Sequence, residues 1–517
     1  MKIQHLISFL LPLLGSHSVH ADVTLSKVFG NHMVIQQELP IRIFGKAEPG
    51  EKITVKFGEK TGQGSTSEDG TFRVDLPGMK ADGKARTLTV SGKNTVTLKD
   101  VLLGEVWICS GQSNMEWSVA ASLNPKTEIA AANYPKIRLY NVPGHVASPT
   151  PLEDPRGKWE VCSPSTISGF SAVGYYFGKS LHQELKVPIG LVGTNWGGTR
   201  IEPWTPPVGF RQVKSLQDYS ESLDILDPAT PVGKKHLNDY MAKMETWMTQ
   251  AKANLKAEKR ISNPPVLSNT PKAGASTIYN GMVHGLIPLS VRGAIWYQGE
   301  SNAGDGLRYE FLKEALVKGW RSVFENEELS FYWVQLANFQ NPSVNPEGGG
   351  WGPVREGQRR ALRLPKTGMA VIIDIGEARD IHPKNKQDVG ARLALWALAK
   401  DYGKKVTYSG PLYKSMKIEG DKIRIFFDHA EAGLITAKKE GLAPAQETEE
   451  EVTQFAIQEK NGSWYWATAK IEGDTVVVYA NGVSKPQNVR FGYQSNPDDI
   501  NLYNFEGLPA SPFTTEK

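Results

Sequence analysis

Residues Gly104 to Trp117 have the sequence G-E-V-W-I-C-S-G-Q-S-N-M-E-W. This stretch is the starting point for predicting the fold of the chain. Residues 106–109 are apolar and favour β structure, and the run breaks at Ser110-Gly111 before Gln112-Ser113-Asn114. An apolar run that stops at glycine and small polar residues indicates a buried strand ending in a tight turn. Ligands of α/β sheets bind at the carboxyl ends of the strands. We therefore expect Ser113 at a strand tip, with its hydroxyl facing a cleft.

Length and composition indicate a multidomain globular protein. The chain has 517 residues, too many for one hydrophobic core, and its 40% hydrophobic and 22% charged residues are ordinary for a soluble protein. The net charge is +4. No run of five or more Lys or Arg residues occurs, so a nucleic-acid partner is not expected.

The first 21 residues have the pattern of a secretory signal peptide. Lys2 supplies a positive start, Leu6 to Leu14 form a short apolar core, and Ala21 ends a small-residue cleavage site. We expect cleavage near Ala21 and a secreted or periplasmic protein. The apolar core is too short to span a membrane, and no later segment is long enough.

The chain has two cysteines, Cys109 and Cys162. A bridge between them is possible. Because Cys109 lies inside the expected strand, we favour a small buried hydrophobic side chain at that position.

The pattern of apolar residues changes twice along the chain. Residues 22–100 contain short alternating runs separated by Gly-rich turns, which predicts a β-sandwich-like domain. Residues 101–402 alternate strands with helices, which predicts a parallel sheet covered on both faces. A Pro-rich insertion with one long helix interrupts this region at about 205–275, and residues 403–517 return to β character. The predicted fold class is an α/β domain flanked by amino-terminal and carboxyl-terminal all-β domains.

Several expected strands of the α/β region end in glycine and polar side chains. These ends are 111–114, 193–199 and 298–302, and a further strand precedes a loop with Asp380 and His382. The carboxyl ends of parallel strands lie at one edge of a sheet, so the four ends converge on one crevice. We expect a composite site there.

Ser113 and His382 are the expected nucleophile and base. A serine hydroxyl needs an adjacent base, normally histidine, and the base needs an orienting acceptor. His382 lies in a loop after a strand, with Asp380 two residues before it and Pro383 after it. His284 also precedes a strand and remains possible.

Acyl transfer also needs hydrogen-bond donors that face the developing oxyanion. The candidates are the Ser113 N–H, the N–H of Gly198 in the Gly197-Gly198 pair, and the side-chain amide of Gln298 or Asn302. Position 115 is Met, so the motif is not the Gly-x-Ser-x-Gly elbow of α/β-hydrolases. No His-Glu-x-x-His and no Gly-x-Gly-x-x-Gly after a strand is present, so neither a metal nor a dinucleotide cofactor is expected.

Five segments resemble the sialate O-acetylesterase family of SGNH-type (GDSL-like) hydrolases. They are Gly104–Trp117, Gly193–Trp204, Arg292–Asn302, Asp380–Leu395 and Asn501–Phe513. The resemblance implies a flavodoxin-like central domain flanked by β domains, and hydrolysis of acetyl esters on sugars. It also implies that Ser113 is the nucleophile and His382 the base.

The sequence departs from this family pattern at one position. SGNH enzymes usually carry an aspartate three residues before the histidine, where this chain has Arg379; its aspartate is Asp380. Either Asp380 or a backbone carbonyl near 379–380 therefore orients His382.

Side chains beside the motifs are candidates for substrate binding, namely Trp196, Arg200, Glu300 and Asn302. Tryptophan can stack on a sugar or belong to the core, and Arg200 can pair with a carboxylate such as that of sialic acid. The expected substrate is an acetylated carbohydrate, first O-acetylated sialic acid, with acetylated xylan or another polysaccharide as the alternative. A non-catalytic carbohydrate-binding protein is the alternative of another class, and the sequence does not indicate an oligomeric state.

Overall fold

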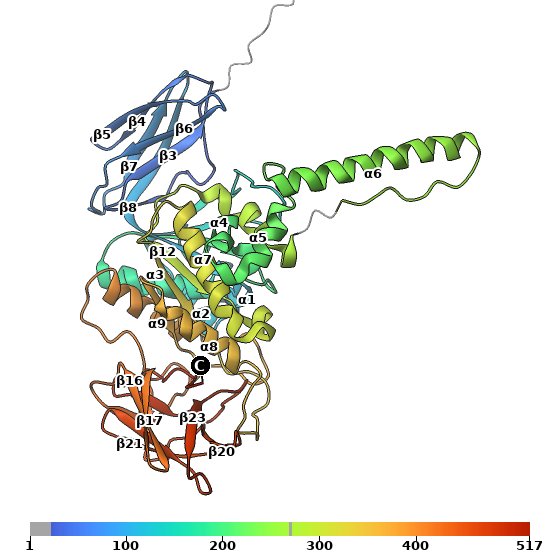
Figure 1. The fold of residues 1–517 in the computed structure, drawn as a ribbon. Coiled ribbons are helices and arrows are strands. Elements are labelled where there is room, and N and C mark those ends of the chain that lie inside the picture. Colours follow the sequence, from blue (N-terminus) through green and yellow to red (C-terminus); the bar gives the residue numbers. More distant parts are fainter. Residues whose placement is uncertain (1–21, 268–270, 517) are drawn as a thin grey trace, which may run out of the picture.

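The computed structural model describes residues 22–267 and 271–516. The expected signal peptide, residues 1–21, lies outside the described residues. Figure 1 shows a β region at each end of the molecule, an α/β region between them, and one long helix that projects from the middle.

Strand β8 (Thr95–Gly111) organises the amino-terminal half of the molecule. Its first part pairs antiparallel with β7 (Arg86–Ser91). Its last part lies between β11 (Ile189–Asn195) and β12 (Gly293–Tyr297) and is parallel to both. One strand thus belongs to the amino-terminal β region and to the central sheet, and the expected boundary between residues 100 and 101 falls inside it.

The central sheet has the strand order β10-β9-β11-β8-β12-β13-β14. The strands not yet bounded are β9 (Tyr134–Asn141), β10 (Trp159–Cys162), β13 (Ser330–Val334) and β14 (Thr367–Ala370). All neighbours in this order are parallel except β9 and β10, so the predicted parallel sheet is confirmed.

The flavodoxin-like classification of the central domain stays a prediction. Numbered along the chain, the parallel strands of this path have the order 2-3-1-4-5-6. Flavodoxin-like folds have the order 2-1-3-4-5, which is the order of β11-β8-β12-β13-β14 when these five strands are numbered among themselves; β9 adds a strand at the edge. Buried interior strands have the same apolar pattern whatever their neighbours, so the sequence identifies the strands but not their order.

Helices pack together in two groups beside this sheet. Helix α3 (Ala172–Leu185) packs on α9 (Lys386–Lys400), and α7 (Tyr309–Val323) packs on α4 (Pro207–Arg211) and α8 (Gly352–Arg360). Two shorter helices, α1 (Ser113–Glu116) and α2 (Pro125–Ala131), follow β8.

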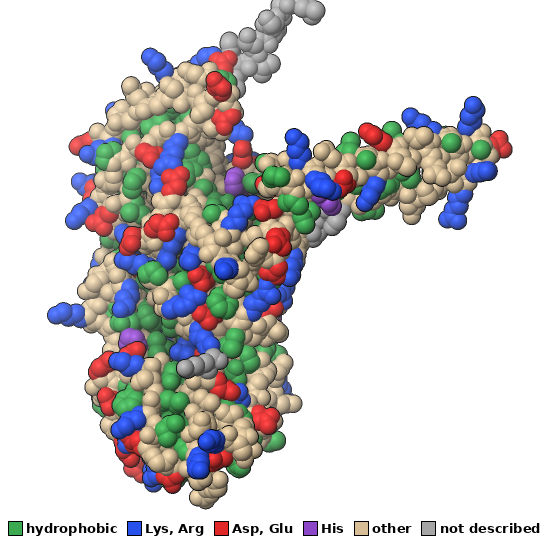
Figure 2. All heavy atoms as spheres, viewed as in Figure 1, with side chains coloured by type: hydrophobic (Ala, Val, Ile, Leu, Met, Phe, Trp, Pro, Cys, Tyr) green, Lys and Arg blue, Asp and Glu red, His purple; other side chains and the backbone are tan. Residues whose placement is uncertain are grey.

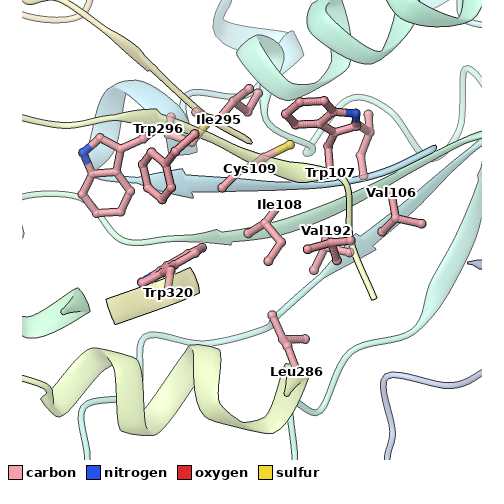
Figure 3. Packing of buried hydrophobic residues seen from close by; sticks show 14 of the residues in the cluster. Val106, Trp107, Ile108, Cys109, Val192, Leu286, Ile295, Trp296 and Trp320 are labelled. Atoms are coloured by element: carbon pink, nitrogen blue, oxygen red, sulfur yellow. The ribbon is translucent and has the colours of Figure 1, made fainter. Parts of the chain in front are cut away.

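Side chains of β8 alternate between the two faces of the sheet (Figure 3). Trp107 meets Phe177 of α3 edge-on, with ring centroids 5.0 Å apart, while Ile108 points to the other face. Cys109 and Cys162 are both buried free thiols, so the possible disulfide does not form. Burial raises the pKa of Cys162 to about 12, as expected for an unreactive thiol.

The two flanking regions are built from short strands that pair antiparallel, except β2, which pairs parallel with β8. The further amino-terminal strands are β1 (Thr24–Leu25), β2 (Val34–Gln36), β3 (Ile41–Lys46), β4 (Lys52–Phe57), β5 (Lys60–Ser65) and β6 (Thr71–Leu76). The carboxyl-terminal strands are β15 (Leu412–Glu419), β16 (Lys422–Asp428), β17 (Leu434–Lys438), β18 (Gln446–Glu447), β19 (Phe455–Glu459), β20 (Trp464–Trp466), β21 (Thr468–Glu472), β22 (Thr475–Tyr479), β23 (Pro486–Phe491), β24 (Leu502–Asn504) and β25 (Phe513–Thr514). The carboxyl-terminal strands enclose a hydrophobic core of their own.

The expected insertion contains α4, α5 (Gln217–Asp224) and the long helix α6 (Pro231–Lys256). The side chain of Thr230 accepts a hydrogen bond from the Gly233 N–H at 3.0 Å and so caps the start of α6. Helix α6 extends away from the body, and Figure 2 shows Lys and Arg side chains along it. Among the residues described, no helix is long and apolar enough to cross a membrane.

Candidate active site

Ser113 lies at the carboxyl end of β8, where the strand gives way to α1. Gly111 ends the strand with φ 140°, and a Cβ there would lie 2.2 Å from the backbone oxygen of Tyr297 in β12. Only glycine fits where the two strands pass so closely. Ser113 is the first residue of α1, so its N–H has no partner inside the helix.

The imidazole of His382 reaches the hydroxyl of Ser113. His382 Nε2 lies 2.9 Å from Ser113 Oγ, although 269 residues separate them in the chain. Trp117, at the end of α1, stacks on the His382 ring with centroids 4.6 Å apart and planes 11° apart. Burial lowers the pKa of His382, and the positive charge of Lys386 lowers it further. The ring is therefore neutral near pH 7, as a general base must be.

Asp380 lies beside His382 without bonding its ring. Asp380 Oδ1 accepts the backbone N–H of His382 at 2.9 Å, and it lies 3.7 Å from His382 Nδ1. The second distance is that of an ion pair rather than a hydrogen bond. Within residues 22–267 and 271–516, neither Asp380 nor a backbone carbonyl near 379–380 accepts a hydrogen bond from Nδ1. The stacked Trp117 is thus the contact that fixes the plane of the ring.

Two backbone N–H groups are free beside Ser113. In the described part of the chain, the N–H groups of Ser113 and Gly198 have no acceptor. Gly198 has φ 73°, and a Cβ on it would meet nothing within 4 Å, so open space lies over this turn. The neighbouring Gly197 N–H is already used, because it donates to Glu116 Oε2 at 2.7 Å.

Gln298 and Asn302 are buried and face the protein, contrary to the expectation that they meet the substrate. The Gln298 amide nitrogen donates to Thr199 O at 3.2 Å and to Asn302 Oδ1 at 2.7 Å. The Asn302 amide nitrogen donates to Glu202 Oε2 at 3.0 Å and to Asp305 Oδ2 at 2.7 Å. Both amide nitrogens thus donate to protein acceptors. The Gln298 bond to Thr199 O holds the end of the turn that carries Gly198.

Arg200 is also committed to protein partners. Its guanidinium donates to Glu202 Oε1 at 2.7 Å, to Asp305 Oδ2 at 2.7 Å and to Ser301 O at 3.1 Å. Two carboxylates therefore balance its charge. Trp196, in contrast, is half-buried and stacks on His145.

A buried polar network joins the Ser113 turn to the His382 loop. The Asn114 amide nitrogen donates to Glu300 Oε1 at 2.6 Å and to Ile381 O at 2.9 Å, and Asn114 Oδ1 accepts from Lys386 Nζ at 2.5 Å. Burial raises the pKa of Glu300 and lowers the pKa of Lys386 to about 7. Glu300 thus acts inside this network rather than on an open surface.

Sequence reasoning missed Lys386, Glu116 and His145. Lys386 lies four residues after His382, and Glu116 lies three residues after Ser113. For these two, proximity to the expected catalytic residues was the available signal, but the sequence does not show which way the side chains point; for His145 the sequence gives no such signal.

A serine and a neutral histidine in contact at the carboxyl edge of a parallel sheet, beside two free N–H groups, define the class of serine hydrolases. The family model described as "Carbohydrate esterase, sialic acid-specific acetylesterase" matches residues 103–260. The rat sialate O-acetylesterase is 30% identical over 430 residues, which are 75% of this chain and 75% of the rat protein. The human sialate O-acetylesterase is 28% identical over 458 residues, 80% of this chain and 79% of the human protein.

A solved structure is similar over nearly the whole chain. The crystal structure of a carbohydrate acetylesterase from Xanthomonas citri aligns with a TM-score of 0.77 and 33% identity, covering 96% of this chain and 100% of that one. The chain belongs to the sialate O-acetylesterase family, and it is a carboxylic ester hydrolase.

Proposed function

We propose that this protein removes O-acetyl groups from sugars through an acetyl-enzyme intermediate, with Ser113 as nucleophile and His382 as general base. The observation that carries the proposal is the 2.9 Å contact between His382 Nε2 and Ser113 Oγ in a chain of this esterase family. His382 accepts the hydroxyl proton of Ser113 while Ser113 Oγ attacks the acetyl carbonyl carbon. The C–O bond to the sugar then breaks as His382 gives its proton to the sugar oxygen, which leaves as a hydroxyl. Water, activated by the same imidazole, hydrolyses the acetyl-enzyme, and His382 returns the proton to Ser113 Oγ as acetate leaves.

The free N–H groups of Ser113 and Gly198 are the proposed oxyanion donors. The turn packs against Ser113, since a Cβ on Gly197 would lie 3.2 Å from Ser113 Cβ, and open space lies over Gly198, where we place the charge that develops on the carbonyl oxygen. Gln298 supports this arrangement indirectly by holding Thr199 O at 3.2 Å. Asp380, 3.7 Å from Nδ1, stabilises the imidazolium through its charge.

O-acetylated sialic acid is the first substrate to test, because the family is named for it. A second candidate, acetylated xylan or another polysaccharide, follows from the contacts of Arg200. That guanidinium is already balanced by Glu202 and Asp305, so it offers little free charge to the carboxylate of sialic acid.

We infer in addition that residues 101–402 form an SGNH-type hydrolase domain, which contains an insertion at about 205–275. Residues 22–100 form a domain before it, and residues 403–517 form a domain after it. The separate core of the carboxyl-terminal strands supports the last division. The pattern of residues 1–21 supports action after export, with cleavage near Ala21.

Acetate release tests the proposal. Wild type and Ser113→Ala are compared on 9-O-acetylated sialic acid, acetylated xylan and 4-nitrophenyl acetate. Ser110→Ala is the matched control, because the buried Ser110 hydroxyl has no hydrogen-bond partner among the described residues. We expect Ser113→Ala to lose at least about 10³-fold in kcat and Ser110→Ala to keep its activity.

Each other outcome has a distinct meaning. Activity that survives in Ser113→Ala would show that another residue is the nucleophile. Cleavage of 4-nitrophenyl acetate alone would exclude both acetylated sugars as substrates. An inactive wild type would favour the carbohydrate-binding alternative.

A further inference from the structure

A second histidine–carboxylate pair lies beside Ser113, on the side of the Gly197-Gly198 turn. His145 follows the carboxyl end of β9, so it comes from the same edge of the sheet as Ser113. Its Nε2 lies 2.8 Å from Glu116 Oε1. Glu116 belongs to the same short helix as Ser113, and the neighbouring Trp117 stacks on His382. Glu116 and the next residue, Trp117, thus contact two different histidines.

Glu116 connects this pair to the turn that carries the proposed oxyanion donor. Its second oxygen, Oε2, accepts the Gly197 N–H at 2.7 Å. A Cβ on Gly197 would lie 3.2 Å from the Cβ of Ser113 and 3.2 Å from Glu116 Oε2, so the turn packs directly against the nucleophile. The bond to Glu116 occupies the Gly197 N–H, while the next N–H, that of Gly198, has no acceptor among the described residues.

His145 stacks face to face on Trp196, the residue that directly precedes the Gly197-Gly198 turn. Their rings stack with centroids 5.0 Å apart and planes 7° apart. The His145 side chain is 44% exposed, and Trp196 is half-buried. Because Trp196 directly precedes Gly197-Gly198, the stacked pair adjoins the place where an acetyl ester would meet Ser113. Aromatic faces and a ring nitrogen are the groups that bind sugar rings and their hydroxyls.

We propose that His145 and Trp196 form the subsite for the sugar leaving group, and that Glu116 is a positioning residue that fixes both His145 and the Gly197-Gly198 turn. The proposal rests on the proposed function, because it takes Ser113 as the nucleophile. The ester's sugar ring lies against the stacked pair, and Glu116 touches neither the substrate nor the reacting atoms. The subsite is selective for acetyl esters whose alcohol is a sugar.

The experiment compares sugar esters with an ester whose alcohol is not a sugar. kcat and KM are measured for acetylated xylo-oligosaccharides, 9-O-acetylated sialic acid and 4-nitrophenyl acetate. The variants are His145→Ala, Glu116→Ala and Glu116→Gln, with Ser113→Ala alongside. His32→Ala is the matched control: this histidine is 47% exposed and lies 2.7 Å from the carboxylate of Asp100, in the amino-terminal β region.

His145→Ala should lower kcat/KM for the sugar ester that the wild type cleaves by about tenfold, mainly through KM. Its effect on 4-nitrophenyl acetate should be clearly smaller, so the ratio of the two values falls. Glu116→Ala should lower kcat for both kinds of ester, since the turn loses its anchor. Glu116→Gln, which keeps an acceptor for the Gly197 N–H, should restore much of that kcat. His32→Ala should match wild type throughout.

If Ser113→Ala is inactive, either of two results would contradict the proposed subsite and leave the proposed nucleophile in place. One is an equal effect, or no effect, of His145→Ala on both kinds of ester. The other is a Glu116→Gln variant as impaired as Glu116→Ala. If Ser113→Ala itself stays active, the proposed nucleophile is wrong, and the subsite built around it is wrong as well.

Discussion

Asp380 differs from the aspartate of a catalytic triad because it bonds the backbone N–H of His382, at 2.9 Å, and not the ring. An asparagine side chain keeps an oxygen for that N–H. We therefore expect Asp380→Asn to lower kcat by about tenfold, far less than the ~10⁴-fold loss when a ring-bonded triad aspartate becomes asparagine. Steady-state kinetics on 4-nitrophenyl acetate measures the loss. A 10⁴-fold loss would show that the carboxylate bonds Nδ1 during the reaction.

Lys386 contributes to the position of the acid limb of the pH profile, because its charge lowers the pKa of His382. Burial is the first cause of the lowered pKa of His382, and the charge of Lys386 is the second. Lys386, with a pKa of about 7, carries its charge below pH 7, where that limb lies. Removing the charge raises the pKa of His382, so Lys386→Met should move the acid limb of kcat/KM to higher pH.

The pH profile of kcat/KM for 4-nitrophenyl acetate tests this effect. Lys384→Met is the control, because the Lys384 side chain is 52% exposed and does not contribute to the pKa of His382. An acid limb that stays in place in Lys386→Met, or that moves equally in Lys384→Met, would contradict the role of Lys386.

At the scale of elements, helix α7 buries a lysine among aromatic rings. Lys313 Nζ lies 5.0 Å from the centroid of a Trp296 ring, 5.1 Å from Tyr309 and 5.4 Å from Trp333. Among the described residues, Nζ has no hydrogen-bond partner. Burial lowers the pKa of Lys313 far below its ordinary value, because the charged form loses its water.

Replacing Lys313 with methionine should therefore stabilise the protein. The unfolded chain binds the lysine proton up to pH ~10.4, and the folded chain does not, so the destabilisation is present at neutral pH and fades as the pH rises towards 10.4. Lys313→Met should raise the free energy of unfolding by about 1–3 kcal/mol at pH 7 and by less at pH 10.

Urea denaturation at both pH values measures this gain. Lys318→Met, on the same helix but 38% exposed and paired with Glu314, should change stability by less than about 1 kcal/mol. A destabilised Lys313→Met variant would mean that the ammonium group is satisfied in the folded protein.

The strands that carry the site could be predicted from the sequence. The hydrogen-bond partners of the side chains beside them could not. Apolar runs ending in glycine and polar residues identify β8, β11 and β12, and they place Ser113 at a strand end. A nucleophilic serine needs an adjacent base, normally histidine, and this requirement points to His382 in its loop after a strand. The pattern does not show side-chain direction. Gln298 and Arg200 lie beside the motifs, but Thr199, Glu202 and Asp305 take their hydrogen bonds. Whether a polar side chain bonds the protein or stays free for a substrate depends on which groups lie near it in three dimensions, and the sequence does not show this.

At the scale of the whole molecule, the carboxyl-terminal β region supports the loop that carries His382. Asn338 follows β13, and its side-chain oxygen accepts the Gly376 N–H at 2.8 Å. Its amide nitrogen donates to Asn496 Oδ1 at 2.9 Å, in the carboxyl-terminal region. The position of His382 thus depends on contacts between two regions of the chain.

Arg355 of α8 makes several of these connections at once. Its buried guanidinium donates to carbonyl oxygens on both sides of the interface: Leu336 at 2.8 Å and Ala337 at 2.5 Å after β13, and Gln494 at 2.5 Å and Ser495 at 2.8 Å in the carboxyl-terminal region. Arg355→Ala leaves the carbonyls of Leu336, Ala337 and Gln494 without a donor among the described residues, whereas Ser495 O keeps the Phe339 N–H at 3.1 Å. We expect the free energy of unfolding to fall by about 3–5 kcal/mol, and esterase activity to fall with it, because the His382 loop loses its support.

Thermal unfolding followed by tryptophan fluorescence, together with kcat on 4-nitrophenyl acetate, tests the connection. Arg363→Ala is the matched control: this arginine is 42% exposed and pairs with Glu310 and Glu314, so its loss should cost less than about 1 kcal/mol. If the two β regions and the α/β region are held as one unit, Arg355→Ala shifts a single transition to lower temperature. If Arg355→Ala instead resembles Arg363→Ala in both stability and kcat, the carboxyl-terminal region does not hold the His382 loop in place.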